Sequence, residues 1–126
     1  NSGLGAAHGI GMVIGILYHV PHGEACGILL PHVMKLNAPH TLERMAKVGE
    51  TLTGKRFDSL EEAANAAVDF IYELNAHMNI KPDFKHLNIP KEMFPSIAQQ
   101  SFGTSMSSNP LQMDAKGWEE FLETIL

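Results

Sequence analysis

The sequence predicts an all-α fold, a helical bundle that residues 1–126 form as a single domain. Apolar residues recur at helical spacing in several segments, most clearly from Leu60 to Leu74. No segment shows the sustained apolar–polar alternation that is typical of a half-buried strand. A chain of 126 residues is long enough to bury one sizeable core, and no internal repeat is apparent in it.

The first predicted helix begins after Ser2, which can cap it, and runs to about Leu17. This helix is apolar almost all round, which is typical of a helix in the middle of a core. Each of its glycines costs about 1 kcal/mol relative to alanine. We therefore expect another helix or a ligand to approach closely at these glycines, which are Gly5, Gly9, Gly11 and Gly15.

The next predicted helices follow clear start and stop signals. Pro21 and Gly23 interrupt the chain, and a second apolar helix is predicted over residues 24–36, with a kink at Pro31. After a break at residues 37–39, Thr41 can cap a short helix with the sequence LERMAKVGETL.

The clearest helix begins at Ser59, which forms a capping box with Glu62. Its apolar residues repeat at helical spacing and form one stripe, which consists of Leu60, Ala63, Ala64, Ala67, Val68, Ile71 and Leu74. An extended loop, NIKPDFKHLNIP, leads to Pro90 at the start of a helix KEMFPSIAQQS, and a polar loop SFGTSMSSNPLQM follows. Asp114 caps the final helix, which has Trp118, Phe121, Leu122 and Ile125 on one face.

Composition and charge exclude several function classes. The formal net charge of −5 and the scattered lysines leave no basic stripe for phosphates, which argues against nucleic acid as a partner. Cys26 is the only cysteine, so no disulfide forms within the chain and a reducing cytosol is expected. No apolar stretch reaches the roughly 20 residues that span a bilayer. We therefore expect a soluble cytoplasmic domain with no membrane contact. Because the sequence starts without methionine and in mid-pattern, we expect it to be part of a larger protein.

Most of the histidines have ordinary explanations. His40, His77 and His86 occur in polar or helix-end segments and are expected to face solvent. His32, beside Pro31, fits a polar contact made from a helix.

His8 and His22 differ, because they lie in apolar sequence rich in glycine and alanine. Burying an imidazole there is costly unless its ring nitrogens are bound, and a divalent metal ion binds them well. A helix from His8 to Leu17 rises about 13.5 Å, and the five steps on to His22 can reach back about 16 Å. The two rings can therefore meet, but two imidazoles fall short of the three protein ligands that zinc or iron requires.

These two histidines belong to the pattern G-x-x-x-x-H-x(13)-H-G, with Pro21 before the second histidine and ILLPHVMKLN after it. With the segments LERMAKVGE, TSMSSNP and WEEFLETIL, this pattern closely resembles the iron-containing (group III) alcohol dehydrogenases over nearly the whole chain. The resemblance implies the C-terminal helical domain of the dehydroquinate synthase-like fold, with a dinucleotide-binding domain upstream. It also implies a metal held by an Asp and three His, of which the last two match His8 and His22 and the others would precede Asn1.

The chain departs from the family pattern at two positions. Met12 stands where many members carry another histidine, one helical turn after His8, and a thioether cannot shuttle a proton. Met12 could equally be a plain core residue, and His19 is a speculative substitute for the missing histidine. Leu111 follows Asn109-Pro110 where the family often has arginine. The catalytic proton-transfer residue therefore stays unassigned.

The resemblance implies that the parent enzyme transfers hydride between a small primary or secondary alcohol and a nicotinamide cofactor, with Fe²⁺, or alternatively Zn²⁺, as a Lewis acid. NAD or NADP would be bound mainly upstream, since GLGAAHG lacks a preceding strand and is no dinucleotide fingerprint. We expect the isolated chain to be inactive and the enzyme to be a homo-oligomer. The alternatives are a zinc-dependent glycerol dehydrogenase-like enzyme and a non-catalytic helical interaction module.

Overall fold

The computed structural model describes residues 5–102, 109 and 111–126, and every regular element in this part of the chain is helical, as predicted. The α-helices are α1 (Gly5–Tyr18), α2 (His22–Asn37), α3 (Leu42–Thr53), α4 (Leu60–His77), α5 (Phe94–Gln100) and α7 (Ala115–Ile125). Short 3₁₀ turns occupy Ala38–His40, Lys85–Leu87 and Lys91–Met93. The predicted cap at Ser2 and most of the polar loop before Asp114 lie outside the described residues.

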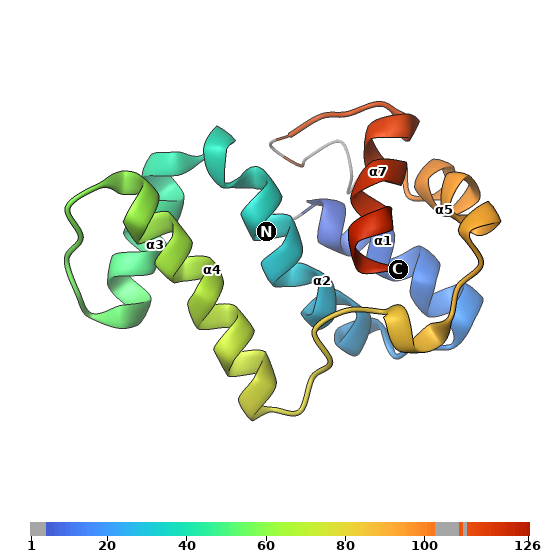
Figure 1. Cartoon of the computed structure of the whole chain (residues 1–126), viewed down its shortest axis with the longest axis horizontal. Helices are drawn as coiled ribbons and strands as arrows, with labels where there is room; N and C mark the ends of the chain where they lie inside the picture. The colour runs from blue at the N-terminus through green and yellow to red at the C-terminus, as the bar shows by residue number, and fades with distance from the viewer. Residues whose placement is uncertain (1–4, 103–108, 110) are drawn as a thin grey trace.

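Helix α2 runs through the middle of the molecule and separates two packed groups of helices (Figure 1). On one side, α3 and α4 form an antiparallel pair, and on the other side lie α1, α5 and α7. The larger core joins α2 to α1, α5 and α7, and its largest fully buried side chains include Trp118, Phe84, Ile10 and Leu29. A smaller core between α2 and α4 is built around Met34, Ala67 and Val68.

Helix α1 is not buried all round, contrary to the sequence-based expectation. Its buried face packs into the larger core, whereas His8, Met12 and Ile16, spaced four residues apart, are exposed along the opposite side. The exposed fractions are 46% for Met12 and 70% for Ile16, so the interpretation of Met12 as a core residue is wrong. The helix therefore presents an apolar stripe at the surface beside His8.

The close approach predicted at the glycines of α1 occurs at Gly11, where α1 packs against α2. A Cβ atom at this position would lie 3.0 Å from the Sγ atom of Cys26 and 3.5 Å from a methyl carbon of Leu29. The absence of a side chain at Gly11 thus allows the two helices to pack closely and leaves room for the thiol between them.

Helix α2 continues through Pro31 and starts at His22, two residues before the predicted start. A proline cannot donate the backbone hydrogen bond to the carbonyl four residues earlier, which here belongs to Gly27. The side-chain Nδ2 of Asn75 in α4 donates to the Gly27 carbonyl oxygen at 2.9 Å instead. The buried Asn75 therefore satisfies the acceptor that the proline leaves free and ties α2 to α4.

Of the three predicted helix caps that lie within the described residues, two are present. The backbone N–H of Glu62 donates to Ser59 Oγ at 3.1 Å, and that of Gly117 donates to Asp114 Oδ1 at 2.9 Å. Thr41 precedes α3 as predicted, but its hydroxyl donates back to the carbonyl of Asn37 at 3.2 Å and does not cap the helix.

The predicted stripe of α4 is buried only in its middle. Ala63, Ala64, Ala67 and Val68 are buried, whereas Leu60 and Leu74 at the ends of the stripe are 46% and 42% exposed.

A buried pair of amide side chains, Asn37 and Asn109, joins α2 to the segment before α7. Each Nδ2 donates to the Oδ1 of the other at 2.9 Å, and Asn109 Nδ2 also donates to the carbonyl of Leu111 at 2.9 Å. Asn109 Oδ1 accepts a further bond, at 3.2 Å, from the backbone N–H of Ala6 in the first turn of α1. This one side chain therefore connects three segments that are far apart in sequence.

Replacing Asn109 with alanine is expected to destabilise the protein by about 2 kcal/mol, because it leaves buried polar groups of Asn37 and Ala6 without these partners. Urea denaturation followed by circular dichroism measures the free energy of unfolding. Asn65→Ala, at an exposed position in α4, is the matched control and should leave that free energy unchanged or slightly raised. Equal stabilities for the two variants would contradict this role of Asn109.

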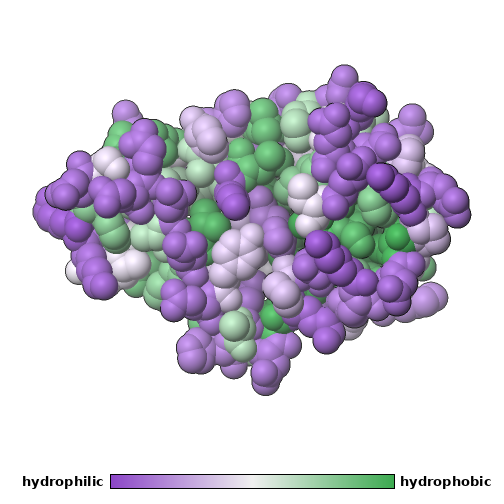
Figure 2. All heavy atoms as spheres, viewed as in Figure 1, coloured by the Kyte–Doolittle hydropathy of each residue, from purple (hydrophilic) through white to green (hydrophobic). Residues whose placement is uncertain are grey.

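The outer surface is mostly polar on the face drawn in Figure 2, with apolar residues exposed between the polar ones toward both ends of the molecule. Among the described residues, none of the helices combines the length and the apolar character that a membrane crossing demands.

Candidate metal centre

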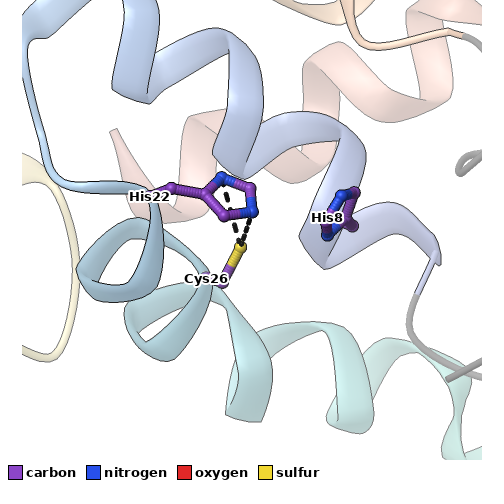
Figure 3. A group of neighbouring side chains, drawn as sticks. All are labelled: His8, His22 and Cys26. Carbon is purple, nitrogen blue, oxygen red and sulfur yellow. Dashed lines mark hydrogen bonds between the residues drawn. The ribbon is translucent and has the colours of Figure 1, made fainter.

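The rings of His8 and His22 meet at the surface where α1 and α2 come together. Their ring centroids are 4.8 Å apart, and the ring planes are inclined by 83° (Figure 3). His8 lies in the first turns of α1, and His22 is the first residue of α2. The proximity expected from the spacing is therefore present. Both side chains are exposed in the part of the protein that the structure describes.

A tight reversal of the chain between the two helices brings His22 back toward His8. Helix α1 ends at Tyr18, and His19 adopts a positive φ of 57°. The chain then folds over Gly15, where a Cβ atom would lie only 2.9 Å from the carbonyl oxygen of Val20. Pro21 precedes the first turn of α2 and ends the reversal. Gly15 thus allows the return of the chain that the metal hypothesis requires.

Cys26 is a third potential ligand in the same place, and it was not predicted from the sequence. The Sγ atom lies 3.6 Å from His22 Nε2 and 4.0 Å from His22 Nδ1. One ligand atom each from His8, His22 and Cys26 can be chosen so that all three lie within 4.8 Å of one another. The sequence did contain a signal, since Cys26 follows His22 by four residues and shares its face of α2.

The Cys26 side chain is half-buried between the two helices. Its Sγ atom lies 3.9 Å from the carbonyl oxygen of Ala7, which directly precedes His8. Burial raises the pKa of the Cys26 thiol above its usual value. Without a cation nearby, the sulfur is therefore a neutral thiol at neutral pH.

The remaining histidines play no part in this group. His40, His77 and His86 are exposed, as predicted, and His19 is exposed in the reversal between α1 and α2. These positions do not bring a further ring to His8 and His22 within the part of the chain that the structure describes.

His32 makes the polar contact that was predicted for it. Its Nε2 bonds to the carbonyl oxygen of Pro82, and its Nδ1 lies 3.0 Å from the hydroxyl oxygen of Tyr72 in α4. Because a carbonyl oxygen can only accept, Nε2 carries the proton and Nδ1 accepts from the tyrosine. Burial and, to a smaller extent, the charge of Asp69 raise the pKa of Tyr72, which keeps its hydroxyl protonated as a donor.

Replacing Tyr72 with phenylalanine is expected to cost about 1 kcal/mol of unfolding free energy, because it removes this hydroxyl and leaves the ring packing intact. Thermal unfolding at neutral pH measures the change. An unchanged unfolding temperature would show that His32 and Tyr72 do not stabilise the contact between α2 and α4.

Comparison with known proteins gives one consistent result. Residues 1–126 match the C-terminal part of the family described as "Fe-containing alcohol dehydrogenase family, C-terminal". Among curated proteins, the chain is 42% identical over 101 residues to lactaldehyde reductase of Escherichia coli K12, covering 79% of this chain and 26% of that protein. It is 30% identical over 132 residues to NADPH-dependent butanol dehydrogenase of Clostridium saccharobutylicum, covering 99% of this chain and 33% of that protein.

Solved structures agree at the level of the fold. The chain superimposes on a crystal structure of 1,3-propanediol oxidoreductase with a TM-score of 0.86 and 27% identity, covering 94% of this chain and 32% of that one. An alcohol dehydrogenase from Oenococcus oeni shares the fold with a TM-score of 0.84, at 23% identity and over 95% and 32% of the two chains. The chain thus spans between a quarter and a third of the length of these relatives.

Proposed function

Since this chain belongs to the iron-containing alcohol dehydrogenase family and matches its C-terminal part, we propose that it is the metal-binding helical domain of an alcohol dehydrogenase. The observation that carries the proposal is the meeting of His8 and His22, whose ring centroids are 4.8 Å apart although the residues lie on different helices. In the resemblance, these two positions match the last two histidine ligands of the family's metal.

The donor set suits a divalent ion of the first transition series. Imidazole nitrogen is a good ligand for both Fe²⁺ and Zn²⁺. Both rings project from helices that pack directly against each other, so their backbones are held by the core and little ordering is needed on binding. We propose that His8 and His22 each bind one divalent ion, Fe²⁺ or Zn²⁺, through a neutral ring nitrogen.

The surface around the two histidines suits contact with another part of the protein. The exposed stripe of α1 carries Met12 and Ile16 next to His8, and Leu17 is 37% exposed at its end. Apolar residues grouped in this way mark contact surfaces for proteins or ligands. Because the relatives are about three times as long as this chain, we propose that a nucleotide-binding part of the protein covers this stripe and supplies the remaining metal ligands.

The proposed reaction is the interconversion of an alcohol and an aldehyde or ketone with NAD or NADP. When bound, the divalent ion supplies Lewis acidity toward the oxygen of the substrate. The role of His8 and His22 is to hold that ion at a fixed place beside the apolar stripe, where a small substrate and the nicotinamide can meet. The relatives named above act on lactaldehyde, butanol and 1,3-propanediol, which suggests a short alcohol as substrate.

Proton transfer in this enzyme cannot use the residue one turn after His8. That residue is Met12, which has no titratable group. We propose that water serves as the proton carrier at this position. The enzyme would also be cytoplasmic and homo-oligomeric, as expected from the sequence.

The proposed function is tested with the full-length protein that contains this chain. Alcohol-dependent reduction of NAD or NADP should disappear on anaerobic chelation and return when Fe²⁺ or Zn²⁺ is added. Turnover by thoroughly metal-free protein, or no turnover with any short alcohol at any metal loading, would overturn the proposal.

A further inference from the structure

We propose that Cys26 is a third ligand to the same ion, so that this chain by itself offers two imidazole nitrogens and one thiolate sulfur. The inference rests on the proposed function for the two histidines and adds a ligand that the family resemblance does not imply. It also predicts which metal the site prefers.

The distances suit coordination by the sulfur and by His22. Zinc bonds of about 2.05 Å to nitrogen and 2.3 Å to sulfur, at the tetrahedral angle, place the two ligand atoms about 3.6 Å apart. The observed distance from Cys26 Sγ to His22 Nε2 is 3.6 Å. The sulfur also lies 4.0 Å from His22 Nδ1, beside the ring, so the His22 ring must turn for Nε2 to point at an ion that it shares with the sulfur.

His8 completes the set with a small movement. Two nitrogen ligands of a tetrahedral zinc ion lie about 3.4 Å apart. The ligand atoms of His8, His22 and Cys26 lie within 4.8 Å of one another, so closing around an ion requires a shift of about 1.5 Å or less. Rotation of the exposed His8 ring about its side-chain bonds can supply this shift.

The placement of the sulfur is a property of the fold and not of one flexible side chain. Cys26 sits one helical turn after His22 and is half-buried against α1. Gly11 leaves the space that the thiol occupies, since a Cβ atom there would lie 3.0 Å from Sγ. In Figure 3 the sulfur lies beside the His22 ring, on the side of α2 that faces α1 and His8.

A thiolate in the set changes the preferred metal. Thiolate is a soft ligand and favours Zn²⁺ over the harder Fe²⁺, whereas imidazole accepts both. The expected ion is therefore zinc, held by His8, His22 and Cys26, with room for further ligands from elsewhere in the protein.

Cobalt is the probe that distinguishes a sulfur ligand from nitrogen ligands alone. Anaerobic titration of the protein containing this chain with Co²⁺ should produce a thiolate-to-cobalt charge-transfer band in the near ultraviolet, in addition to visible d–d bands. Cys26→Ser should remove the charge-transfer band, keep the d–d bands, and lower the preference for Zn²⁺ over Fe²⁺ in competition on the order of tenfold. Cys26→Ala, checked for folding by circular dichroism, should behave in the same way.

The outcomes separate this inference from the proposed function. One outcome is that the visible bands disappear on replacing His8 and His22, but no charge-transfer band is lost in Cys26→Ser. This result would overturn the sulfur ligand and leave the histidine pair intact. Visible cobalt bands that persist in the double variant His8→Ala and His22→Ala would overturn both the sulfur ligand and the histidine pair. Zinc-edge X-ray absorption of the unmutated protein gives an independent answer, because a sulfur neighbour at about 2.3 Å is expected and its absence would also refute the inference.

Discussion

Replacing His22 with alanine in the full-length protein is expected to lower metal affinity and alcohol-dependent turnover by about 100-fold or more, while the fold stays intact. Losing an outer-shell partner of a metal ligand already costs 10- to 100-fold, so losing a ligand itself should cost at least the upper end of that range. His22 is exposed at the start of α2, and its side chain contributes nothing to either core. Inductively coupled plasma mass spectrometry of the purified variant, together with initial rates at saturating metal, measures both effects.

His77→Ala is the matched control for this prediction. His77 is also an exposed histidine, at the C-terminal end of α4, but it is not in the group formed with His8 and Cys26. The His77→Ala variant should bind metal and turn over substrate like the unmutated protein. Full activity of His22→Ala, or an equal loss in both variants, would contradict the assignment of His22.

Replacing Gly49 with alanine is expected to destabilise the protein by about 3 kcal/mol or more, the upper range for inserting a methyl group into a packed interior. Gly49 is the point of closest contact between α3 and α4, where a Cβ atom would lie 1.8 Å from the carbonyl oxygen of Ala63 and 2.8 Å from its carbonyl carbon. These atoms belong to the backbone of α4, so no side chain can rotate away. The two helices must move apart, which opens the contact lined by Ala46 and Ala63.

Urea denaturation of Gly49→Ala should show a lower transition midpoint, and Gly23→Ala is its control. A Cβ atom at Gly23 meets nothing within 4 Å, and alanine is the better helix former by about 1 kcal/mol. The control should therefore be as stable as the unmutated protein or slightly more stable. If Gly49→Ala were also neutral, the packing of α3 on α4 described above would be wrong.

Local sequence signals predicted the helices well, because those signals act within a few residues. The Ser59–Glu62 capping box and the Asp114 cap both lie where expected, and helix starts and ends fall within a few residues of their predicted positions. Thr41 does not cap α3 because its backbone, with φ −139° and ψ 38°, departs from the extended conformation of a capping residue, and its hydroxyl donates to the Asn37 carbonyl instead.

Burial was harder to predict, since it depends on which neighbours cover a helix face. The first helix is apolar in sequence on nearly every side, yet Met12 and Ile16 are exposed because no described element covers that side of α1. Leu60 and Leu74 show the same effect at the ends of α4. Periodicity predicts that a face is apolar, but the tertiary arrangement decides whether it is buried.

Only the two histidines of the candidate site could be predicted from the sequence, for a similar reason. Chain-length arithmetic allowed His8 and His22 to meet, and the family pattern gave them a role. Cys26 was interpreted only as a cysteine without a disulfide partner. Its spacing of four residues from His22 on a predicted helix nevertheless placed Cys26 and His22 on one face. What the sequence could not supply was the orientation of that face toward α1, which Gly11 and the reversal over Gly15 determine.

The central claim is that His8 and His22 bind one divalent ion, and anomalous X-ray diffraction at the metal absorption edge tests it most directly. Crystals of the full-length protein loaded with Zn²⁺ or Fe²⁺ should show an anomalous peak about 2.0 to 2.1 Å from a ring nitrogen of both histidines. A metal peak bound elsewhere, with the two imidazoles free of it, would contradict the account.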